Sequence, residues 1–344
     1  MSAITISKIE GTPKVPIVLA VDIGRTGCRA ALWRGDASEP AATASGDGSI
    51  GLGAVDGPGV AEAAILAVVK PMLQARAVDR IDSIGVGAPG AMEVPALARQ
   101  LAARLADSLS ARTVAVMSDA ITSHAGALGG RPGVVLAAGT GAVTIAIGAN
   151  RQFRRVDGWG PWVGDEGSGA WLGRHGLQAA ARARDGRGPA TVLTDAAARQ
   201  FGSLNDLVMK LGSDPNPART MASFVPAIAD AARNGDAVAL QLLEAGATAL
   251  AGSMIAAAQA IDTSGPIAGV IIGGLVNLGP LLLEPLRATL EHSGVNLQLQ
   301  PAQGTSIDGA RHLAIVDDGI HEQWTVRVRR EIAAAADTRS RGAA

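Results

Sequence analysis

The stretch IVLAVDIGRTGCRAALW, residues 17–33, holds two short apolar segments separated by a glycine-flanked threonine turn. Apolar segments of this length with turn residues between them predict two buried strands. The same form returns near the middle of the chain, where VVLAAGTGAVTIAIG covers residues 134–148. A third short strand candidate follows each copy, AATAS at 41–45 and RQFRRV at 151–156. The repeat predicts two related domains.

Alternating helix and strand patterns fill the rest of the chain. In the first half we expect a helix over 58–75, a strand and turn over 83–90, a helix over 94–108 and a strand over 113–117. In the second half we expect helices over roughly 168–184, 190–212, 218–233, 236–262 and 279–292, and strands over 268–272 and 295–299. Hairpin-type strands followed by this alternation indicate an α/β fold with mixed sheets.

Length and composition exclude several classes of function. The 344 residues suffice for two domains, and 30 basic against 31 acidic residues leave a net charge of −1. This balance, with 2% aromatic residues, predicts no nucleic-acid partner and no anionic membrane partner. The single cysteine, Cys28, forms no internal disulfide, four-cysteine zinc site or iron–sulfur cluster. No apolar run of about 18 residues and no leader pattern is visible, so we expect a cytoplasmic protein.

Both threonine turns have the composition of phosphate-binding loops. Glycine lets the backbone approach a phosphate, converging N–H groups bind anions, and a threonine hydroxyl adds a donor. The candidate phosphate ligands are Gly24, Thr26 and Gly27 in the first turn, and Gly139, Thr140 and Gly141 in the second. Asp22, at the end of the first strand, could hold Mg²⁺ directly or through water. Glycine turns are also ordinary hairpin connections, and neither turn has the Walker A or dinucleotide pattern.

Asp119 follows the strand pattern TVAVM, within SDAITSHAG at residues 118–126. The carboxyl end of a buried strand in an α/β domain faces the ligand crevice. A carboxylate there could accept the proton of an attacking hydroxyl during phosphoryl transfer. The alternative role is to cap the helix that begins at Ala120. We expect His124, one turn further on, to be a packed or surface residue.

Three of the five tryptophans lie in GWGPWVGDEGSGAWLGR, residues 158–174, around two adjacent acids. A carboxylate accepts hydrogen bonds from two neighbouring sugar hydroxyls, tryptophan faces cover apolar C–H patches, and glycines allow close approach of the backbone. The stretch is therefore a candidate sugar-binding loop. Asp165 and Glu166 could instead serve only the N-terminus of the helix that starts near Ser168.

The motifs VDIGRTGCRA, VLAAGTGAV and VIIGGLVN resemble the two phosphate motifs and the adenosine motif of the actin/hexokinase ATPase superfamily. GWGPWVGDEGSGAWLGR is similar to the signature of the BadF/BadG/BcrA/BcrD-type group, and within it to the N-acetylglucosamine kinases. The motifs cover roughly residues 17–315. The resemblance implies two ribonuclease-H-like domains with a nucleotide and sugar cleft between them. It implies a domain at 1–118, a larger one at 119–307, and a C-terminal helix at about 308–335 that packs back on the first.

The resemblance also implies a function. It is that of a kinase that uses ATP and Mg²⁺ to phosphorylate a hydroxyl, expected to be that of C6, on an amino sugar such as N-acetylglucosamine or glucosamine. Asp119 would be the general base. The residues that would contact the sugar are Asp165, Gly158, Trp159 and Gly160. Gly273 and Gly274, in GGLVNLG, would approach adenosine, and the alternative is a plain strand-to-helix turn.

Other residues of the stretch 158–174 are expected to have structural roles. We expect Glu166 and Ser168 to orient the loop and cap its helix, and Trp162 and Trp171 to lie in the core. The resemblance implies a small-molecule sugar as the partner. Whether the chain forms a homodimer stays open.

Two loops depart from the family pattern. Ile23 and Arg25 stand where the first phosphate loop commonly has glycine. GDGSIGLG lacks the asparagine that often contacts the sugar, and Ser49 is the candidate in its place. The acceptor sugar therefore stays open. The alternative function is that of an ATPase that activates a partner enzyme. Family members with that function carry a cluster-binding pair of cysteines, which Cys28 alone does not supply.

Overall fold

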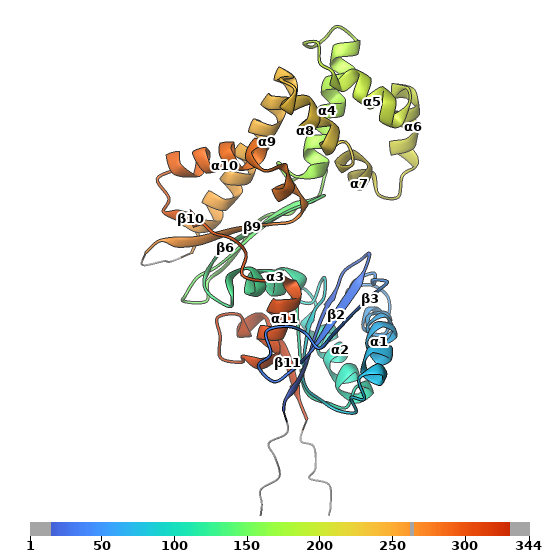
Figure 1. Ribbon diagram of the computed structural model, residues 1–344, viewed down its shortest axis with the longest axis vertical. Helices are drawn as coiled ribbons and strands as arrows, with labels where there is room; N and C mark the ends of the chain where they lie inside the picture. Colours follow the sequence, from blue (N-terminus) through green and yellow to red (C-terminus); the bar gives the residue numbers. More distant parts are fainter. Residues whose placement is uncertain (1–14, 262–264, 331–344) are drawn as a thin grey trace, which may run out of the picture. The chain divides into compact units, whose positions relative to one another are not determined.

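The computed structural model describes residues 15–261 and 265–330, which form two α/β units (Figure 1). Of the described residues, unit 1 contains 15–119, 310–317 and 324–330. Unit 2 contains 120–261, 265–309 and 318–323. Each unit has its own sheet and its own buried core.

The sheet of unit 1 has six strands in the order β11-β5-β4-β1-β2-β3. The strands are β1 (Ile17–Ile23), β2 (Cys28–Arg34), β3 (Ala42–Gly46), β4 (Ile81–Gly87), β5 (Ala111–Met117) and β11 (Val326–Arg329). β2 runs antiparallel to its two neighbours β1 and β3, whereas β4 is parallel to β1 and β5 is parallel to β4. The helices α1 (Gly57–Ala75) and α2 (Pro95–Ser108) pack on this sheet. β1 is buried almost throughout, as a central strand of a covered sheet should be.

The sheet of unit 2 has five strands in the order β10-β9-β6-β7-β8. The strands are β6 (Gly133–Ala138), β7 (Ala142–Ile147), β8 (Phe153–Asp157), β9 (Ile267–Ile272) and β10 (Leu297–Leu299). β7 runs antiparallel to its two neighbours β6 and β8, and β9 is parallel to β6. The order β9-β6-β7-β8 therefore repeats the order β4-β1-β2-β3 of unit 1. The duplicated frame predicted from the two threonine turns is confirmed.

Unit 2 also contains eight α-helices and one 3₁₀ helix among its described residues. They are α3 (Asp119–Leu128), α4 (Gly169–Arg184), α5 (Leu193–Phe201), α6 (Leu204–Ser213), α7 (Pro217–Ala222), α8 (Val225–Arg233), α9 (Ala237–Gln259) and α10 (Pro280–His292), with the 3₁₀ helix η1 (Gly274–Leu278). The helix α11 (Ser306–Ile315) begins in unit 2 and ends in unit 1. A short 3₁₀ helix, η2 (Glu322–Trp324), precedes β11.

Among the described residues, α9 is the one helix long and apolar enough to cross a membrane by length and composition. It packs against α10, α8 and α4 and against the sheet of unit 2. Leu243, Leu250 and Met254 are fully enclosed on its inner side. These contacts are those of a core helix.

The structure corrects three helix predictions. The helix expected over 190–212 is divided into α5 and α6, because Gly202 has φ +82° and Ser203 begins a new helix with a capping box. The helix expected over 218–233 is likewise divided into α7 and α8.

The third correction concerns the C-terminal helix expected over about 308–335. It ends at Ile315, and the alternating sequence Val326–Arg329 forms β11, which pairs antiparallel with β5. Residues 331–335 of that expected helix lie outside the described residues.

Candidate functional site

The second threonine turn, Gly139–Gly141, joins β6 to β7 and supports the start of α4. Its backbone is closed by a hydrogen bond from the Gly139 N–H to the Gly141 carbonyl, at 2.8 Å. The N–H groups of Gly169 and Ala170 donate to the carbonyls of Gly139 and Thr140, at 2.8 and 3.0 Å. The turn is thus fixed directly against the first residues of a helix.

A cavity of about 590 Å³ lies beside this turn, wholly within unit 2. The turn, the start of α4, the helix α8 and η1 form its walls. Its lining residues are Gly139, Thr140, Gly169, Ala222, Val225, Pro226, Ala229, Asp230, Arg233, Gly274, Leu275, Asn277 and Leu278. The volume is that of a small-molecule site, and most of its walls are apolar with a few polar side chains, which suits a nucleoside.

The two glycines that follow β9 have different surroundings. Gly273 has φ +100°, and a Cβ added to it would lie 2.4 Å from the carbonyl oxygen of Ala138. Gly274 lines the cavity, and a Cβ added there would meet nothing within 4 Å. Gly273 is therefore required for packing against β6, whereas Gly274 faces the space available to a ligand.

The stretch from Gly158 to Gly167 forms a loop, here called the tryptophan loop, that is held by the last residue of β8. The Asp157 carboxylate accepts the Asp165 N–H at 2.7 Å and the Glu166 N–H at 2.8 Å. Sequence reasoning missed Asp157. The only signal in the sequence is an aspartate directly before the Gly-Trp-Gly turn.

Asp165 lies between the tryptophan loop and the second threonine turn. Its side chain is 9% exposed, its Oδ1 accepts the Gly160 N–H at 3.0 Å, and a Cβ added to Gly141 would lie 2.6 Å from its Oδ2. Burial raises the pKa of the Asp165 carboxyl, and the charge of Asp157 adds to this rise. The N–H group of Gly160 is the main opposing effect on the same pKa.

Two of the tryptophans are exposed and one is packed. Trp159 is 69% exposed, and the Arg155 guanidinium lies 5.3 Å from the centre of its ring. Trp162 is 67% exposed, so the expectation that it lies in the core is wrong. Its turn is held by the Gly164 N–H, which donates to the Gly160 carbonyl at 2.9 Å. Trp171 packs against the core of unit 2, as expected.

The start of α4 agrees with the helix-cap prediction. The Ser168 hydroxyl accepts the Trp171 N–H at 3.2 Å, which satisfies one of the free donors of the first turn. Glu166 is exposed and contributes its N–H to Asp157. Ser168 therefore caps the helix, and Glu166 takes part in the loop through its backbone.

The first threonine turn, in unit 1, is closed by a 2.8 Å hydrogen bond from the Gly24 N–H to the Gly27 carbonyl. The loop that carries Ser49 lies directly against it. The Ser49 N–H donates to the Gly24 carbonyl at 2.9 Å, and a Cβ added to Gly48 would lie 2.2 Å from the same oxygen. The Ser49 side chain is buried. Within unit 1, Ser49 is thus a neighbour of the first turn, which also holds Thr26.

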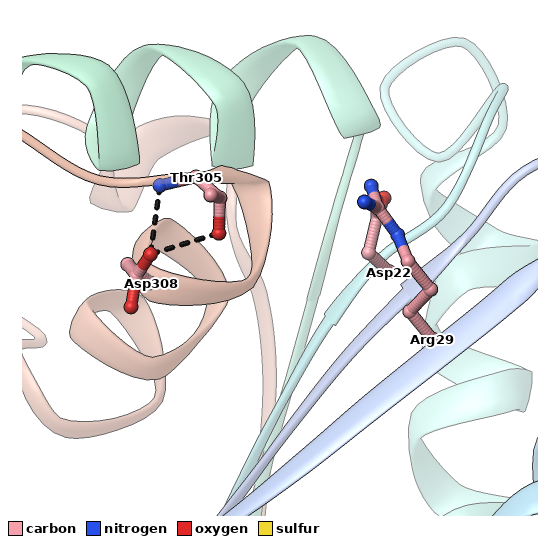
Figure 2. Close-up of polar contacts among 4 residues, drawn as sticks. All are labelled: Asp22, Arg29, Thr305 and Asp308. Atoms are coloured by element: carbon pink, nitrogen blue, oxygen red, sulfur yellow. Dashed lines mark hydrogen bonds and ion pairs between the residues drawn. The ribbon is translucent and has the colours of Figure 1, made fainter. Parts of the chain in front are cut away.

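Asp22 forms an ion pair with Arg29 across β1 and β2, at 2.5 Å (Figure 2). Figure 2 also shows Asp308, whose carboxylate accepts from the N–H and hydroxyl of Thr305 at the start of α11. In the described part of the chain, no group of three or more histidine, cysteine or acidic side chains could hold a metal. Magnesium that binds with a nucleotide needs only one or two carboxylates beside phosphates and water, so Asp22 fits such a role.

Asp119 is the first residue of α3, with one residue between it and the end of β5, and it is exposed. Further along α3, His124 is fully buried, as a packed residue should be. Its Nδ1 lies 2.9 Å from Nε2 of His321, and its Nε2 lies 3.0 Å from the Gly133 carbonyl. Burial lowers the pKa of His124 to about 4. The pair connects α3 to the segment before η2.

Comparisons with known proteins bear on the family and the fold of the chain. The sequence model of the BadF/BadG/BcrA/BcrD ATPase family matches residues 19–306. The N-acetylmuramic acid/N-acetylglucosamine kinase of Clostridium acetobutylicum is 27% identical over 202 residues, which are 57% of this chain and 65% of that protein. The chain thus matches slightly less than two thirds of that relative. The glucosamine kinase GspK of Vibrio cholerae is 28% identical over 239 residues, 66% of this chain and 75% of that protein.

A solved structure supports the fold. The putative N-acetylglucosamine kinase of Chromobacterium violaceum superposes with a TM-score of 0.68 at 28% identity. The match covers 88% of this chain and all of that one. The expected pair of ribonuclease-H-like domains, as in actin-like ATPases, is confirmed.

Proposed function

Because the chain belongs to the BadF/BadG/BcrA/BcrD ATPase family, we propose that it is an ATP-dependent kinase that phosphorylates a hydroxyl of an amino sugar. The names of its relatives support this class: one is a kinase of N-acetylmuramic acid and N-acetylglucosamine, and another is a glucosamine kinase. The observation that carries the proposal is the contact between Asp165 and Gly141. A candidate sugar ligand lies against a candidate phosphate ligand, and phosphoryl transfer requires these two substrates to meet.

The nucleotide side of the proposal uses the cavity of unit 2. Adenosine would lie between η1 and α8, with Gly274 at its wall. The phosphates would then reach Gly139 and Thr140 at the other wall, where a glycine backbone and a threonine hydroxyl can donate. In unit 1, Gly24, Thr26 and Gly27 of the first threonine turn stay proposed phosphate ligands.

The sugar side uses the tryptophan loop. The Asp165 carboxylate already accepts from the Gly160 N–H through Oδ1 and from the backbone of Ala142, and its remaining lone pairs can accept from sugar hydroxyls. The exposed ring of Trp159 is available for the apolar face of a sugar. Gly158 and Gly160, which flank Trp159, have no side chain.

The proton and the metal involve residues outside this loop. Asp119 would accept the proton of the attacking hydroxyl, which we take to be that of C6. Asp22 would hold Mg²⁺, directly or through water, after its contact with Arg29 rearranges. When bound, Mg²⁺ neutralises charge on the transferred phosphoryl group. Side chains that exclude water from the site would suppress hydrolysis of the nucleotide.

The experiment is a measurement of ADP release with ATP and Mg²⁺. The acceptors are glucosamine, N-acetylglucosamine, N-acetylmannosamine, N-acetylmuramic acid, glucose and no sugar. We expect release that depends on at least one amino sugar and that is lost in Asp165→Asn. The matched control is Asp185→Asn, an exposed aspartate of the same unit that pairs with Arg187. Release that is equal with and without every sugar would contradict the kinase and favour the ATPase that activates a partner enzyme.

A further inference from the structure

We propose that Asp157 is the positioning residue of the sugar site: its carboxylate fixes the backbone of Asp165 and Glu166, and so directs the Asp165 side chain toward the second threonine turn. Asp157 lies before the tryptophan loop, as the last residue of β8. The effect of Asp157 on turnover rests on the proposed kinase function. Its effect on the order of the tryptophan loop is independent of that function.

The hydrogen bonds of Asp157 span most of the loop. Its Oδ1 accepts the Asp165 N–H at 2.7 Å, eight residues away, and its Oδ2 accepts the Glu166 N–H at 2.8 Å, nine residues away. The Trp159 N–H lies 3.5 Å from Oδ1. One carboxylate therefore holds both ends of the loop together, and bonds from N–H groups to a charged acceptor are strong ones.

The backbone between these contacts is held in an uncommon conformation. Asp157 has φ +60° and Asp165 has φ +54°, and Gly158 and Gly160 also have positive φ. Non-glycine residues seldom adopt this region, although aspartate does so more often than most, and contacts with the surroundings stabilise it. At Asp165 the enforcing contact is the bond from its own N–H to Asp157. The orientation of the Asp165 side chain thus depends on Asp157.

The interior of the loop leaves room for this carboxylate and little else. A Cβ added to Gly164 would lie 2.3 Å from Asp157 Oδ1. The glycine that precedes Asp165 is therefore required by the carboxylate of Asp157. This explains one glycine of the loop without any contact to a ligand.

Asp157 also acts on Asp165 through its charge. The charged groups that affect the Asp165 carboxyl are Asp157 and Arg155, both from the end of β8. After burial and the Gly160 N–H, the negative charge of Asp157 raises the pKa of Asp165, and the positive charge of Arg155 lowers it. Arg155 is held in place by its own Nε, which donates to the Asp157 carbonyl at 3.2 Å.

The test compares Asp157→Asn, Asp157→Glu and Asp185→Asn. Asparagine keeps the size of the side chain but loses the charge and one acceptor oxygen. We expect amide hydrogen exchange in a peptide that contains residues 165 and 166 to become at least about tenfold faster in Asp157→Asn. We expect KM for the sugar to rise about tenfold or more, while KM for ATP changes by less than about twofold. Asp185→Asn should match the wild type in each measurement.

The pH profile separates charge from shape. Asp157→Asn removes the negative charge that raises the pKa of Asp165. Where protonation of Asp165 sets the acid limb of kcat/KM for the sugar, that limb therefore moves to lower pH in this variant. Asp157→Glu keeps the charge on a longer side chain, so its acid limb should stay near that of the wild type although its KM rises. If Asp157 only stabilised the fold, the acid limbs of the two variants would not differ in this way.

Two results would overturn the proposal. One is unchanged exchange at residues 165 and 166 in Asp157→Asn, provided that circular dichroism shows the variant to be folded. The other is a sugar KM within about twofold of the wild type. If the wild type itself shows no sugar-dependent ADP release, the kinase function fails, and the exchange measurement still decides the role of Asp157. If Asp157→Asn does not fold, the same exchange measurement is made on Asp157→Glu, where unchanged exchange overturns the proposal.

Discussion

The carboxylate of Asp165 lies so close to Gly141 that a Cβ added to this glycine would come within 2.6 Å of Asp165 Oδ2. The two residues belong to the tryptophan loop and to the second threonine turn, which are separate in the sequence. Their contact makes the sugar side and the phosphate side of the proposed site one packed structure. A Cβ added in the threonine turn is therefore expected to disturb the sugar side of the site.

Gly141→Ala tests this coupling. The new methyl group would displace the Asp165 carboxylate, so we expect kcat/KM for the sugar to fall about 10- to 100-fold, which corresponds to about 1.4 to 2.7 kcal/mol. Steady-state kinetics at saturating ATP measures this effect. The control is Gly212→Ala in α6, where a Cβ would meet nothing within 4 Å. Gly141→Ala with the kinetics of the wild type would show that the contact has no part in turnover.

Gly273 and Gly274 form a second matched pair. Gly273→Ala would place a methyl group 2.4 Å from the Ala138 carbonyl at φ +100°, so we expect a loss of about 1 to 3 kcal/mol in the free energy of unfolding. Gly274→Ala would add a methyl group to the cavity wall with no clash, so we expect unchanged stability and an affinity for ATP about threefold or more lower.

Denaturant unfolding and ATP titration distinguish the two variants of this pair. Should Gly274→Ala bind ATP as the wild type does, the cavity of unit 2 would not be the nucleoside site. Should Gly273→Ala keep full stability, the close approach between β9 and β6 would not matter for folding.

The parts of the fold that the sequence predicts well are those set by neighbouring residues. The paired strands around each threonine turn follow from short apolar runs with glycine between them, and both sheets contain them. The Ser168 cap follows from a residue type favoured at that position. Local chemistry determines these features, so a single sequence suffices to predict them.

The parts that it predicts poorly depend on distant residues or on loop geometry. β11 pairs with β5 across about two thirds of the chain, a relationship that no local pattern contains. Trp162 has the size and apolarity of a core residue, but its turn directs it to solvent. The role of Asp157 depends on N–H groups eight and nine residues away, and only the folded loop brings them to its carboxylate.

The buried pair of His124 and His321 predicts a dependence of stability on pH. Burial lowers the pKa of His124 from 6.5 to about 4 in the folded protein. Between these values the unfolded chain binds a proton that the folded protein does not, so acidification favours unfolding. In the wild type, this histidine should contribute a loss of about 1 kcal/mol in the free energy of unfolding between pH 7.5 and 5.5.

His124→Gln is the variant for this test, because its amide can still donate to the Gly133 carbonyl but does not titrate. We expect it to be less stable at pH 7.5, by roughly 1 to 3 kcal/mol, and to lose less stability than the wild type on acidification. Urea unfolding at both pH values measures the difference. His312, whose pKa is also lowered by burial, is present in both proteins and cancels in the comparison. An equal loss in both proteins would rule out His124 as the source.

Asp119 allows the two roles that its sequence position suggests to be separated. As a general base it should be worth about 10²- to 10⁴-fold in kcat. As a polar group at the start of α3 it should stabilise the helix by roughly 1 kcal/mol. Asparagine can serve the helix but cannot accept the proton, and alanine can do neither.

If Asp119 is the base, Asp119→Asn and Asp119→Ala lose kcat to the same extent, and only the alanine variant is less stable. Affinity for ATP should change by less than about twofold in both, because Asp119 is not among the residues that line the cavity of unit 2. Rapid-quench kinetics, ATP titration and thermal unfolding measure the three quantities. If Asp119→Asn keeps the kcat of the wild type, the residue serves the helix alone, and the proton acceptor must be another group.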